Sequence, residues 1–329
     1  TRVRSSAASD VYKRQRQRLL VDGETLTRQR RFRDYDASYE VIRGEINGRF
    51  RWAGLQHRLI FGFDADRFKN DQVFRRARAP TLASNPTPAQ LQAINIFAPV
   101  YANYTLPAPT PLTNRVDTQQ SAGVFAQNQI DLSDRFQLRV GARFDDYKQT
   151  LEDRAANRVT TQQESQVSPQ LGGVFLAHES LSLYASYGEN FRPLSGVDAQ
   201  GRGFDPNQSR SIETGAKFSL GAVEGTVSVF RVEQKNILVV DDPSAFTFAA
   251  AGKARSQGLE MDLQGELAGG LSLWAAYAYV DARTSNSFND ANFGNPVPAG
   301  TRLLNVPQHS LSLQLVKSLP VAGRGLQVG

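Results

Sequence analysis

Three carboxylates recur in one short stretch with a spacing that could support acid–base chemistry or hold a cation. They are Glu260, Asp262 and Glu266, and they alternate with apolar residues between Leu259 and Leu267. Side chains two residues apart in a strand share a face and lie about 6.5 to 7 Å apart, a distance that allows either role. The alternative is a water-facing strand surface, which is often this polar without carrying any chemistry.

The sequence supplies no catalytic partner for these carboxylates. The three histidines, His57, His178 and His309, are dispersed, and no Gly-x-Ser-x-Gly, phosphate-loop or His-Glu-x-x-His motif occurs. The chain has no cysteine, which excludes disulfide bonds and thiolate metal sites. We therefore expect a protein that is not an enzyme, with no catalytic residue and no metal site of its own.

Cationic residues at the ends of predicted strands are candidates for binding rather than catalysis. Arg192 could contact a ligand, and its alternative role is a salt bridge to a neighbouring acidic residue. Arg75, Arg76 and Arg78 form a cluster that could attract an anionic ligand or, alternatively, contact lipid phosphates and solvent.

Aromatic residues in the long predicted loops could stack on planar groups of a ligand and exclude water. The candidates are Tyr101, Tyr104, Phe204 and Phe293, together with Phe97 and Phe288. Their alternative role is to pack the loops on themselves, which a long loop needs in order to hold a shape.

The elements that must position these residues are strands, because the alternation seen at 259–267 recurs along the chain. Between 181 and 192 the apolar residues again occupy every second position, and Glu189 interrupts the apolar face near one end. Two places fit less well. Phe230 falls on the opposite phase from Val229, which indicates a β-bulge or a misread register, and Pro169 removes a ladder donor. We predict twelve strands, at 35–52, 57–78, 118–132, 135–152, 163–177, 181–193, 208–220, 223–240, 252–267, 271–284, 304–318 and from 326 onward.

Short and long connections alternate along the chain. The tight turns are at 53–56, 133–134, 178–180, 221–222 and 268–270, and the longer connections are at 79–117, 153–162, 194–207, 241–251 and 285–303. Bacterial outer-membrane barrels have short periplasmic turns and long extracellular loops, whereas a soluble sandwich has no reason to sort its loops in this way. The pattern predicts an antiparallel transmembrane β-barrel.

Composition is compatible with this interpretation. Mean hydropathy is −0.41, and the longest apolar run, residues 269–280, is shorter than the roughly 20 residues of a membrane helix. The net charge of +6 comes from residues 1–33, which hold ten Lys or Arg and three acidic residues. The rest of the chain carries 28 basic and 29 acidic residues, which argues against a nucleic-acid-binding face.

A set of short motifs occurs in order along the second half of the chain. The motifs are Ser168-Pro-Gln-Leu-Gly172, Leu183-Tyr-Ala-Ser-Tyr-Gly-Glu-Asn-Phe-Arg-Pro193, Glu213-Thr-Gly-Ala-Lys217, Phe230-Arg231 with Lys235-Asn236, Ala251 to Glu260, Ala276-Tyr-Ala-Tyr-Val-Asp281, and Asn305-Val-Pro-Gln-His309. Together they resemble the barrel of TonB-dependent ferric-siderophore receptors. Each motif alone is weak, but the ordered set over residues 165–315 is specific, and a fainter match reaches back to about residue 30.

This resemblance implies an all-β fold that is a partial transmembrane barrel, about 12 of an expected 22 strands, with the plug domain absent. We expect residues 1–15 to be a non-native or disordered segment, 16–34 a loop or partial strand, and 35–329 the incomplete barrel. It also implies a receptor in the outer membrane of a Gram-negative bacterium that imports ferric siderophores with energy relayed by TonB. By itself this piece is expected to be inactive, because unpaired strand edges are costly in lipid.

The resemblance also implies the partners. They are a ferric siderophore, TonB through a missing N-terminal region, and outer-membrane lipid with lipopolysaccharide, but no nucleic acid. No cofactor is expected, because iron travels inside the siderophore. Two alternatives remain open at this point: TonB-dependent uptake of another cargo, such as cobalamin or an oligosaccharide, and a passive porin.

Overall fold

The structure of the chain is a computed structural model. It describes residues 2–5, 23–26, 30–77, 94–101, 108–242, 244, 247–291, 294–321 and 324–329. In these ranges every regular element is a strand. None of the described residues forms a helix of the length and apolarity that crossing a membrane requires.

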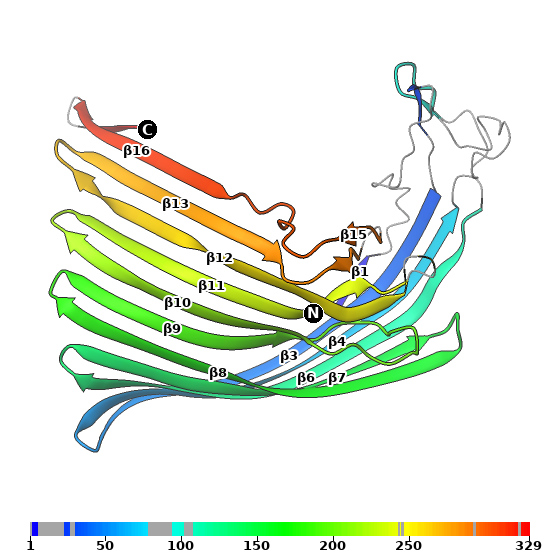
Figure 1. The fold of residues 1–329 in the computed structure, drawn as a ribbon, viewed down its shortest axis with the longest axis horizontal. Helices are drawn as coiled ribbons and strands as arrows, with labels where there is room; N and C mark the ends of the chain where they lie inside the picture. Colours follow the sequence, from blue (N-terminus) through cyan, green and yellow to red (C-terminus); the bar gives the residue numbers. More distant parts are fainter. Residues whose placement is uncertain are drawn as a thin grey trace. The chain divides into compact units, whose positions relative to one another are not determined.

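The long strands form one antiparallel sheet in which sequence neighbours are mostly spatial neighbours (Figure 1). Its path runs β1-β3-β4-β6-β7-β8-β9-β10-β11-β12-β13-β16-β17. The bounds on this path are β1 (Arg2–Ser5), β3 (Arg30–Trp52), β4 (Leu55–Ala77), β6 (Thr110–Ser133), β7 (Phe136–Asp153), β8 (Arg158–His178), β9 (Leu181–Arg192), β10 (Asn207–Leu220), β11 (Val223–Val240), β12 (Phe248–Leu267), β13 (Leu271–Thr284), β16 (His309–Val321) and β17 (Arg324–Val328). The short strands are β2 (Thr25–Leu26), β5 (Ile94–Asn95), β14 (Phe288–Asn289) and β15 (Pro296–Val297).

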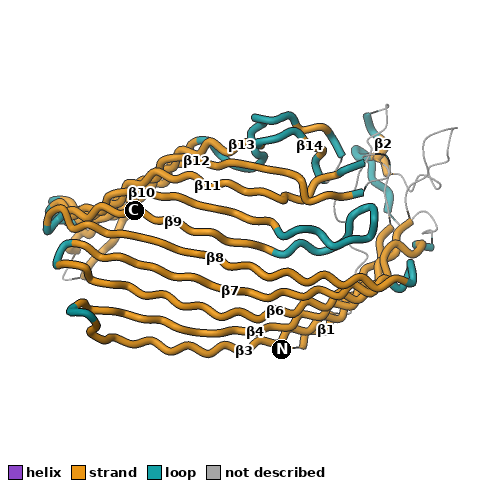
Figure 2. Tube along the Cα trace, turned by 60° about the horizontal axis from the view of Figure 1, so that its bottom comes forward, coloured by secondary structure: helices purple, strands orange, loops and turns teal. Residues whose placement is uncertain are grey.

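The chain divides into two compact units, which are described separately. The first contains Thr1–Val41, Asp66–Gln120 and Lys148–Thr161. The second contains Ile42–Ala65, Ser121–Tyr147 and Gln162–Gly329, and it includes the whole of β9 to β13 and β16. Strands β9 to β13 extend side by side along their lengths (Figure 2).

All twelve predicted strands are present, so the all-β, antiparallel prediction is confirmed. Five further short strands are not among the twelve: β2, β5, β14 and β15 have two residues each, and Arg2–Ser5 form β1, which pairs with residues 35–38 of β3. Residues 6–22 lie outside the described part of the chain, and the expectation that residues 1–15 are a non-native or disordered segment stays a prediction. The predicted loop at 153–162 is also too long, because β7 ends at Asp153 and β8 begins at Arg158.

The tight turns follow from local backbone chemistry. Between β3 and β4 the turn consists of Ala53 and Gly54, with φ of 52° and 80°. Two consecutive residues of positive φ match the twist of a hairpin, and glycine adopts this conformation without steric cost. The turn between β10 and β11 likewise uses Gly221, with φ 64°. The two-residue connections thus fix the hairpin registers.

In the second unit the register separates an apolar face from a polar face. One transverse row joins Leu183, Ala216, Val227, Met261, Tyr277 and Leu311, each paired directly with the next across neighbouring strands. Large apolar side chains on this face are exposed, with Ile212 at 56% and Leu311 at 75%. A soluble protein rarely exposes so continuous an apolar surface, whereas a lipid-facing sheet requires it.

A small buried core lies at the loop ends of β11, β12 and β13. Val240 is 1% exposed, and Ala254 and Ala282 are 5% and 4% exposed. The connection after β13 is tied to this core, because Asn289 of β14 pairs with Val240 and the Thr284 hydroxyl donates to the Pro298 carbonyl at 2.8 Å. The loops at this end therefore fold back onto the sheet.

Aromatic rings cover glycines on neighbouring strands throughout the second unit. Gly215 is paired with Tyr184 and Gly258 with Phe230, and in each case the ring occupies the place of the missing side chain. Such pairs stabilise a sheet because the ring shields an otherwise bare backbone. They also correct the reading of Phe230 as a sign of a bulge. The ladder is regular at that residue, and the irregularity lies instead between Gln234 and Leu238.

Pro169 of β8 lies just outside the described hydrogen-bond ladder between β8 and β9. The described pairing of β8 with β9 begins at Gln170, the next residue. The strand can therefore continue through Pro169 even though proline has no N–H to donate.

Replacing Gly258 by valine tests this packing. A Cβ atom at residue 258 would lie 2.0 Å from the Tyr279 carbonyl oxygen and 3.0 Å from the Phe230 ring. Because the backbone of β13 would have to move, we expect a loss of at least about 1 to 3 kcal/mol in the free energy of unfolding. The matched control is Gly48→Val, since a Cβ there meets no atom within 4 Å. The measurement is the urea midpoint of the full-length protein in detergent, and equal midpoints for the two variants would contradict the prediction.

Candidate ligand-binding site

A polar groove lies at the loop ends of β9, β10 and β11. Its volume is about 270 Å³, and we call it the mouth groove. It is lined by Asn190, Phe191, Arg192, Leu194, Asn207, Ser209, Gln234, Ile237 and Leu238. All these residues belong to the second unit.

Strand register brings the polar members of the mouth groove together. Ser209 is paired with Asn190 on one side and with Gln234 on the other. Arg192 is paired with Asn207 in the next row toward the loops. Residues paired across antiparallel strands present their side chains on the same face. An amide, a hydroxyl, a second amide and a guanidinium therefore converge from three strands.

A β-bulge shapes the far side of the groove. The register of β11 against β12 shifts between Gln234 and Leu238, and Asn236 has a φ of 59°. Asparagine tolerates this left-handed conformation because its side chain forms local hydrogen bonds. Here the Asn236 amide donates to the Pro206 carbonyl at 2.9 Å, and the Asn207 amide donates to the Lys235 carbonyl at 2.9 Å. These bonds fasten the bulge to the beginning of β10.

Arg192 gives the mouth groove its charge. The side chain is exposed, and no carboxylate of the described residues forms an ion pair with it. The alternative role considered for Arg192, a salt bridge to a neighbouring acid, is therefore not seen among these residues. An exposed guanidinium beside two amides and a hydroxyl can bind an anionic ligand rich in oxygen atoms.

The aromatic residues proposed from the sequence to contact a ligand have different surroundings. Phe204 is only 5% exposed, and the amide of the likewise buried Gln162 donates to its carbonyl at 2.6 Å. This burial agrees with the loop-packing alternative. Tyr101 is 72% exposed, whereas Tyr104 and Phe293 lie outside the described residues. Contact of any of these residues with a ligand stays a prediction.

The arginine cluster expected near residue 75 is only partly described. Arg75 lies over the Phe32 ring, with 5.8 Å between the guanidinium carbon and the ring centroid. Arg76 belongs to the same unit, and its backbone carbonyl accepts a hydrogen bond from Thr110 at 2.9 Å. Arg78 lies outside the described residues. Stacking on an aromatic ring orients Arg75 without neutralising its charge.

The loop between β9 and β10 is held by one carboxylate. Asp198 Oδ1 accepts hydrogen bonds from the backbone N–H groups of Gln200 and Arg202, at 2.9 and 2.8 Å. Its Oδ2 accepts a further bond from Arg202 Nε at 2.8 Å. The backbone bond from Arg202, followed by the bond from its guanidinium, holds the pKa of Asp198 below its usual range. This arrangement orders the loop that continues from Arg192.

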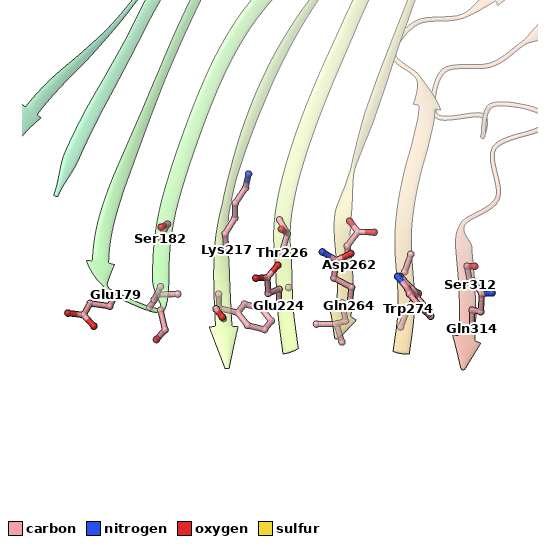
Figure 3. A pocket seen from close by; sticks show the side chains of 18 residues that line it. Glu179, Ser182, Lys217, Glu224, Thr226, Asp262, Gln264, Trp274, Ser312 and Gln314 are labelled. Atoms are coloured by element: carbon pink, nitrogen blue, oxygen red, sulfur yellow. The ribbon is translucent and has the colours of Figure 1, made fainter. Parts of the chain in front are cut away.

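A larger groove of about 570 Å³ lies at the turn ends of β9 to β13 and β16. Figure 3 shows its side chains, among them Lys217, Asp262 and Gln314, projecting from successive strands. Lys217, Thr226 and Asp262 occupy one row of the register. This end of the polar face is a water-accessible surface of mixed charge.

The carboxylates Glu260 and Asp262 are both exposed on this polar face. In the described part of the chain, no group of three or more His, Asp or Glu side chains could hold a metal ion. The two carboxylates thus have the setting of a water-facing strand surface, which was the alternative to a chemical role. Elsewhere on the polar face charges are paired, as in Arg143, which contacts Asp64 and Asp145 at 2.7 and 2.5 Å.

Sequence reasoning selected Arg192 but missed its partners in the mouth groove. The alternation placed Asn190 on the same face as Arg192, so this residue could have been found. Asn207, Ser209 and Gln234 come from other strands, and only the register shows that they are neighbours. The sequence contained no comparable signal for them.

The Asp198 contacts predict how the β9–β10 loop responds to mutation and pH. Asp198→Asn should lower the amide protection factors of residues 200 and 202, because an amide is a weaker acceptor than a carboxylate. A carboxylate with a lowered pKa stabilises the loop above its usual pKa, about 4, and loses this effect as the pH falls through its lower pKa in the folded protein. Protection in the wild type should therefore fall only in that acidic range. Asp205→Asn, a substitution of an exposed residue in the same loop, is the control; equal protection in both variants would refute the assignment.

Comparisons with known proteins agree with this geometry. The model of the family described as TonB dependent receptor-like, beta-barrel, matches residues 3–319. The metal-pseudopaline receptor CntO of Pseudomonas aeruginosa is 32% identical over 312 residues, which cover 92% of this chain and 42% of the relative. The ferrichrome outer membrane transporter/phage receptor of Escherichia coli is 24% identical over 275 residues, covering 82% of this chain and 34% of that protein. The chain thus spans less than half the length of these two relatives.

Solved structures show the same fold. The siderophore receptor PiuA of Acinetobacter baumannii superposes with a TM-score of 0.75 at 20% identity, covering 90% of this chain and 46% of that chain. BauA, the ferric preacinetobactin receptor of the same species, gives a TM-score of 0.69 at 21% identity, with 91% and 43% covered. Proteins of this family are receptors and transporters of the Gram-negative outer membrane, not enzymes. The chain therefore belongs to the TonB-dependent receptor-like β-barrel family and forms part of such a barrel in the outer membrane.

Proposed function

We propose that the protein containing this chain imports ferric-siderophore complexes across the outer membrane with energy relayed by TonB. The observation that carries the proposal is the family match over residues 3–319. In this function the barrel supplies ligand contacts at its loop ends and a polar inner surface, and no covalent chemistry takes place. Iron remains coordinated by the siderophore, so the protein needs no metal ligands of its own.

The mouth groove supports a cargo that is anionic and rich in oxygen atoms. Arg192 provides an exposed positive charge, and Asn190, Ser209 and Gln234 provide amide and hydroxyl groups. A volume of about 270 Å³ is at the lower limit of typical ligand pockets, about 300 to 1,000 Å³. The mouth groove would therefore contact one edge of the cargo. Contact of Tyr101, Tyr104 and Phe293 with the cargo is a separate proposal. Phe204 would act mainly by ordering its loop, because it is buried.

A second cargo has a specific observation in its favour. CntO, which is 32% identical to this chain, is named as a receptor for metal-pseudopaline. The alternative proposal is therefore a metal complex in which the metal need not be iron. The amides and the guanidinium of the mouth groove would contact the chelator rather than the metal. The groove could therefore bind either cargo. Cobalamin, oligosaccharides and passive diffusion have no comparable observation in their favour.

Uptake by the full-length protein in whole cells tests both proposals. Cells that lack their other siderophore receptors should accumulate radioactive iron when supplied with a matching ferric siderophore, and a parallel panel should contain nickel, cobalt and zinc chelates. Uptake should disappear in an otherwise identical strain without TonB. Accumulation that continues without TonB would indicate a passive porin. Binding of none of the metal complexes, together with binding of cobalamin or an oligosaccharide, would refute the metal-complex proposal.

Arg192 is the residue whose removal should weaken binding most. We expect Arg192→Gln to raise the Kd for the matching metal complex about tenfold, because one charge-assisted contact contributes roughly 1.5 to 3 kcal/mol. Lys253→Gln is the control, since it removes one exposed positive charge outside the mouth groove. The measurement is isothermal titration calorimetry on the detergent-solubilised receptor. A Kd changed equally by both substitutions would mean that net charge, not the groove, attracts the cargo.

A further inference from the structure

Four polar side chains of the mouth groove have no protein partner in the part of the chain that the structure describes. No hydrogen bond or ion pair joins their side-chain atoms to another described residue. In contrast, the amide of Asn207 is already engaged, because it donates to the Lys235 carbonyl. The four side chains are those of Asn190, Arg192, Ser209 and Gln234. They are therefore available to a ligand.

None of the described residues that line the mouth groove is acidic. Two glutamates, Glu189 and Glu233, are adjacent in sequence to lining residues, but alternation along a strand directs them to the opposite face. There Glu189 accepts a hydrogen bond from the Tyr187 hydroxyl, and Glu233 forms an ion pair with Arg210. The guanidinium of Arg192 therefore carries a positive charge that no lining residue neutralises.

The four available side chains lie at two levels along the strands. Asn190, Ser209 and Gln234 form one row across three strands, and this row spans about 10 Å because neighbouring strands are about 4.8 Å apart. Arg192 lies two residues beyond Asn190 on β9, which is about 7 Å nearer the loops. One charged donor group is thus followed by a row of neutral polar groups within a groove of about 270 Å³.

A carboxylate is the anionic group that this arrangement fits. A guanidinium donates two parallel N–H groups, which match the two oxygen atoms of one carboxylate in a bidentate contact. A hydroxamate or catecholate group in a metal complex has both oxygen atoms bound to the metal, which leaves no such free pair. A catecholate ring would also need an aromatic partner. Of the described lining residues only Phe191 is aromatic, and alternation along β9 directs its side chain to the face opposite that of Arg192.

We propose that the mouth groove selects metal complexes whose chelator carries a carboxylate that is not bound to the metal. Arg192 binds this carboxylate, and the row that begins at Asn190 binds oxygen atoms on the adjacent part of the chelator. Because the metal is not contacted, complexes of different metals with the same chelator bind alike. The inference rests on the proposed function, since it names the class of metal complex that the receptor takes.

Two ferric complexes that differ in one group test the proposal. Desferrioxamine B is a hydroxamate chelator with a terminal amine, and succinylation of this amine adds a free carboxylate, whereas acetylation adds none. We expect the full-length receptor in detergent to bind the ferric succinyl form at least about tenfold more tightly than the ferric acetyl form, because one charge-assisted contact is gained. Ferric citrate, a carboxylate complex, and ferric enterobactin, a catecholate complex without a free carboxylate, extend the comparison. Affinities are measured by isothermal titration calorimetry.

Two variants, each with a matched control, separate the carboxylate contact from net charge. Arg192→Lys keeps the charge but loses the pair of parallel donors, so the preference for the succinyl form should shrink, whereas Arg135→Lys, near a tight turn, should leave it unchanged. Gln234→Glu places a carboxylate in the mouth groove with little change in shape, so repulsion should abolish the preference. Gln264→Glu makes the same change on the same face at the turn ends and should have no effect.

The proposal is overturned if the acetyl form or ferric enterobactin binds as tightly as the succinyl form, or if no carboxylate-bearing complex binds. Equal effects of Gln234→Glu and Gln264→Glu would also overturn it. TonB-dependent uptake by cells of only those metal complexes that lack a free carboxylate would refute the carboxylate selection and leave the proposed function intact. Heat-modifiable gel mobility establishes that each variant is folded, and the comparison of the two ferrioxamine forms on the wild type depends on no variant.

Discussion

The fold depends on one constraint: every backbone N–H and C=O group inside a membrane needs a partner within the protein. An antiparallel ladder between long neighbouring strands satisfies this constraint, as β9 to β13 do in nearly unbroken register. The ladder in turn forces side chains to alternate between two faces. Separation of lipid-facing from water-facing residues is therefore a consequence of the ladder. It accounts for a surface on which Ile212 and Leu311 are exposed while polar side chains line the other side.

Departures from the regular ladder occur where the protein needs a particular shape. The bulge between Gln234 and Leu238 coincides with the mouth groove, and the hydrogen bonds of Asn207 and Asn236 hold it in place. The bulge therefore positions side chains that a uniform strand could not bring together. Elsewhere the ladder stays regular, and glycines opposite Tyr184 and Phe230 leave room for the aromatic rings on the polar face.

The two faces of the same strands place arginines in different surroundings. On the polar face, Arg192 lies among amides and a hydroxyl, an arrangement suited to an anionic, water-soluble complex. On the opposite face, Arg255 and Arg283 are directly paired, and the next row toward the tight turns still contains Arg231 and Asp281. The same side-chain type thus has different neighbours because the pleat of the sheet directs successive residues to opposite faces.

The sequence by itself determined the twelve long strands, the tight turns and the alternation of faces along a regular strand, because alternation with a period of two and turn chemistry are local properties of the chain. It identified Arg192 for the same reason, from its phase and its place at a strand end. Only the tertiary structure decided which residues of different strands are neighbours, such as Ser209 beside Gln234 or Arg255 beside Arg283. It also decided that Phe204 is buried and that β8 begins as early as Arg158. The physical reason is that register and loop packing depend on contacts between segments far apart in the sequence, which a pattern along one strand does not contain.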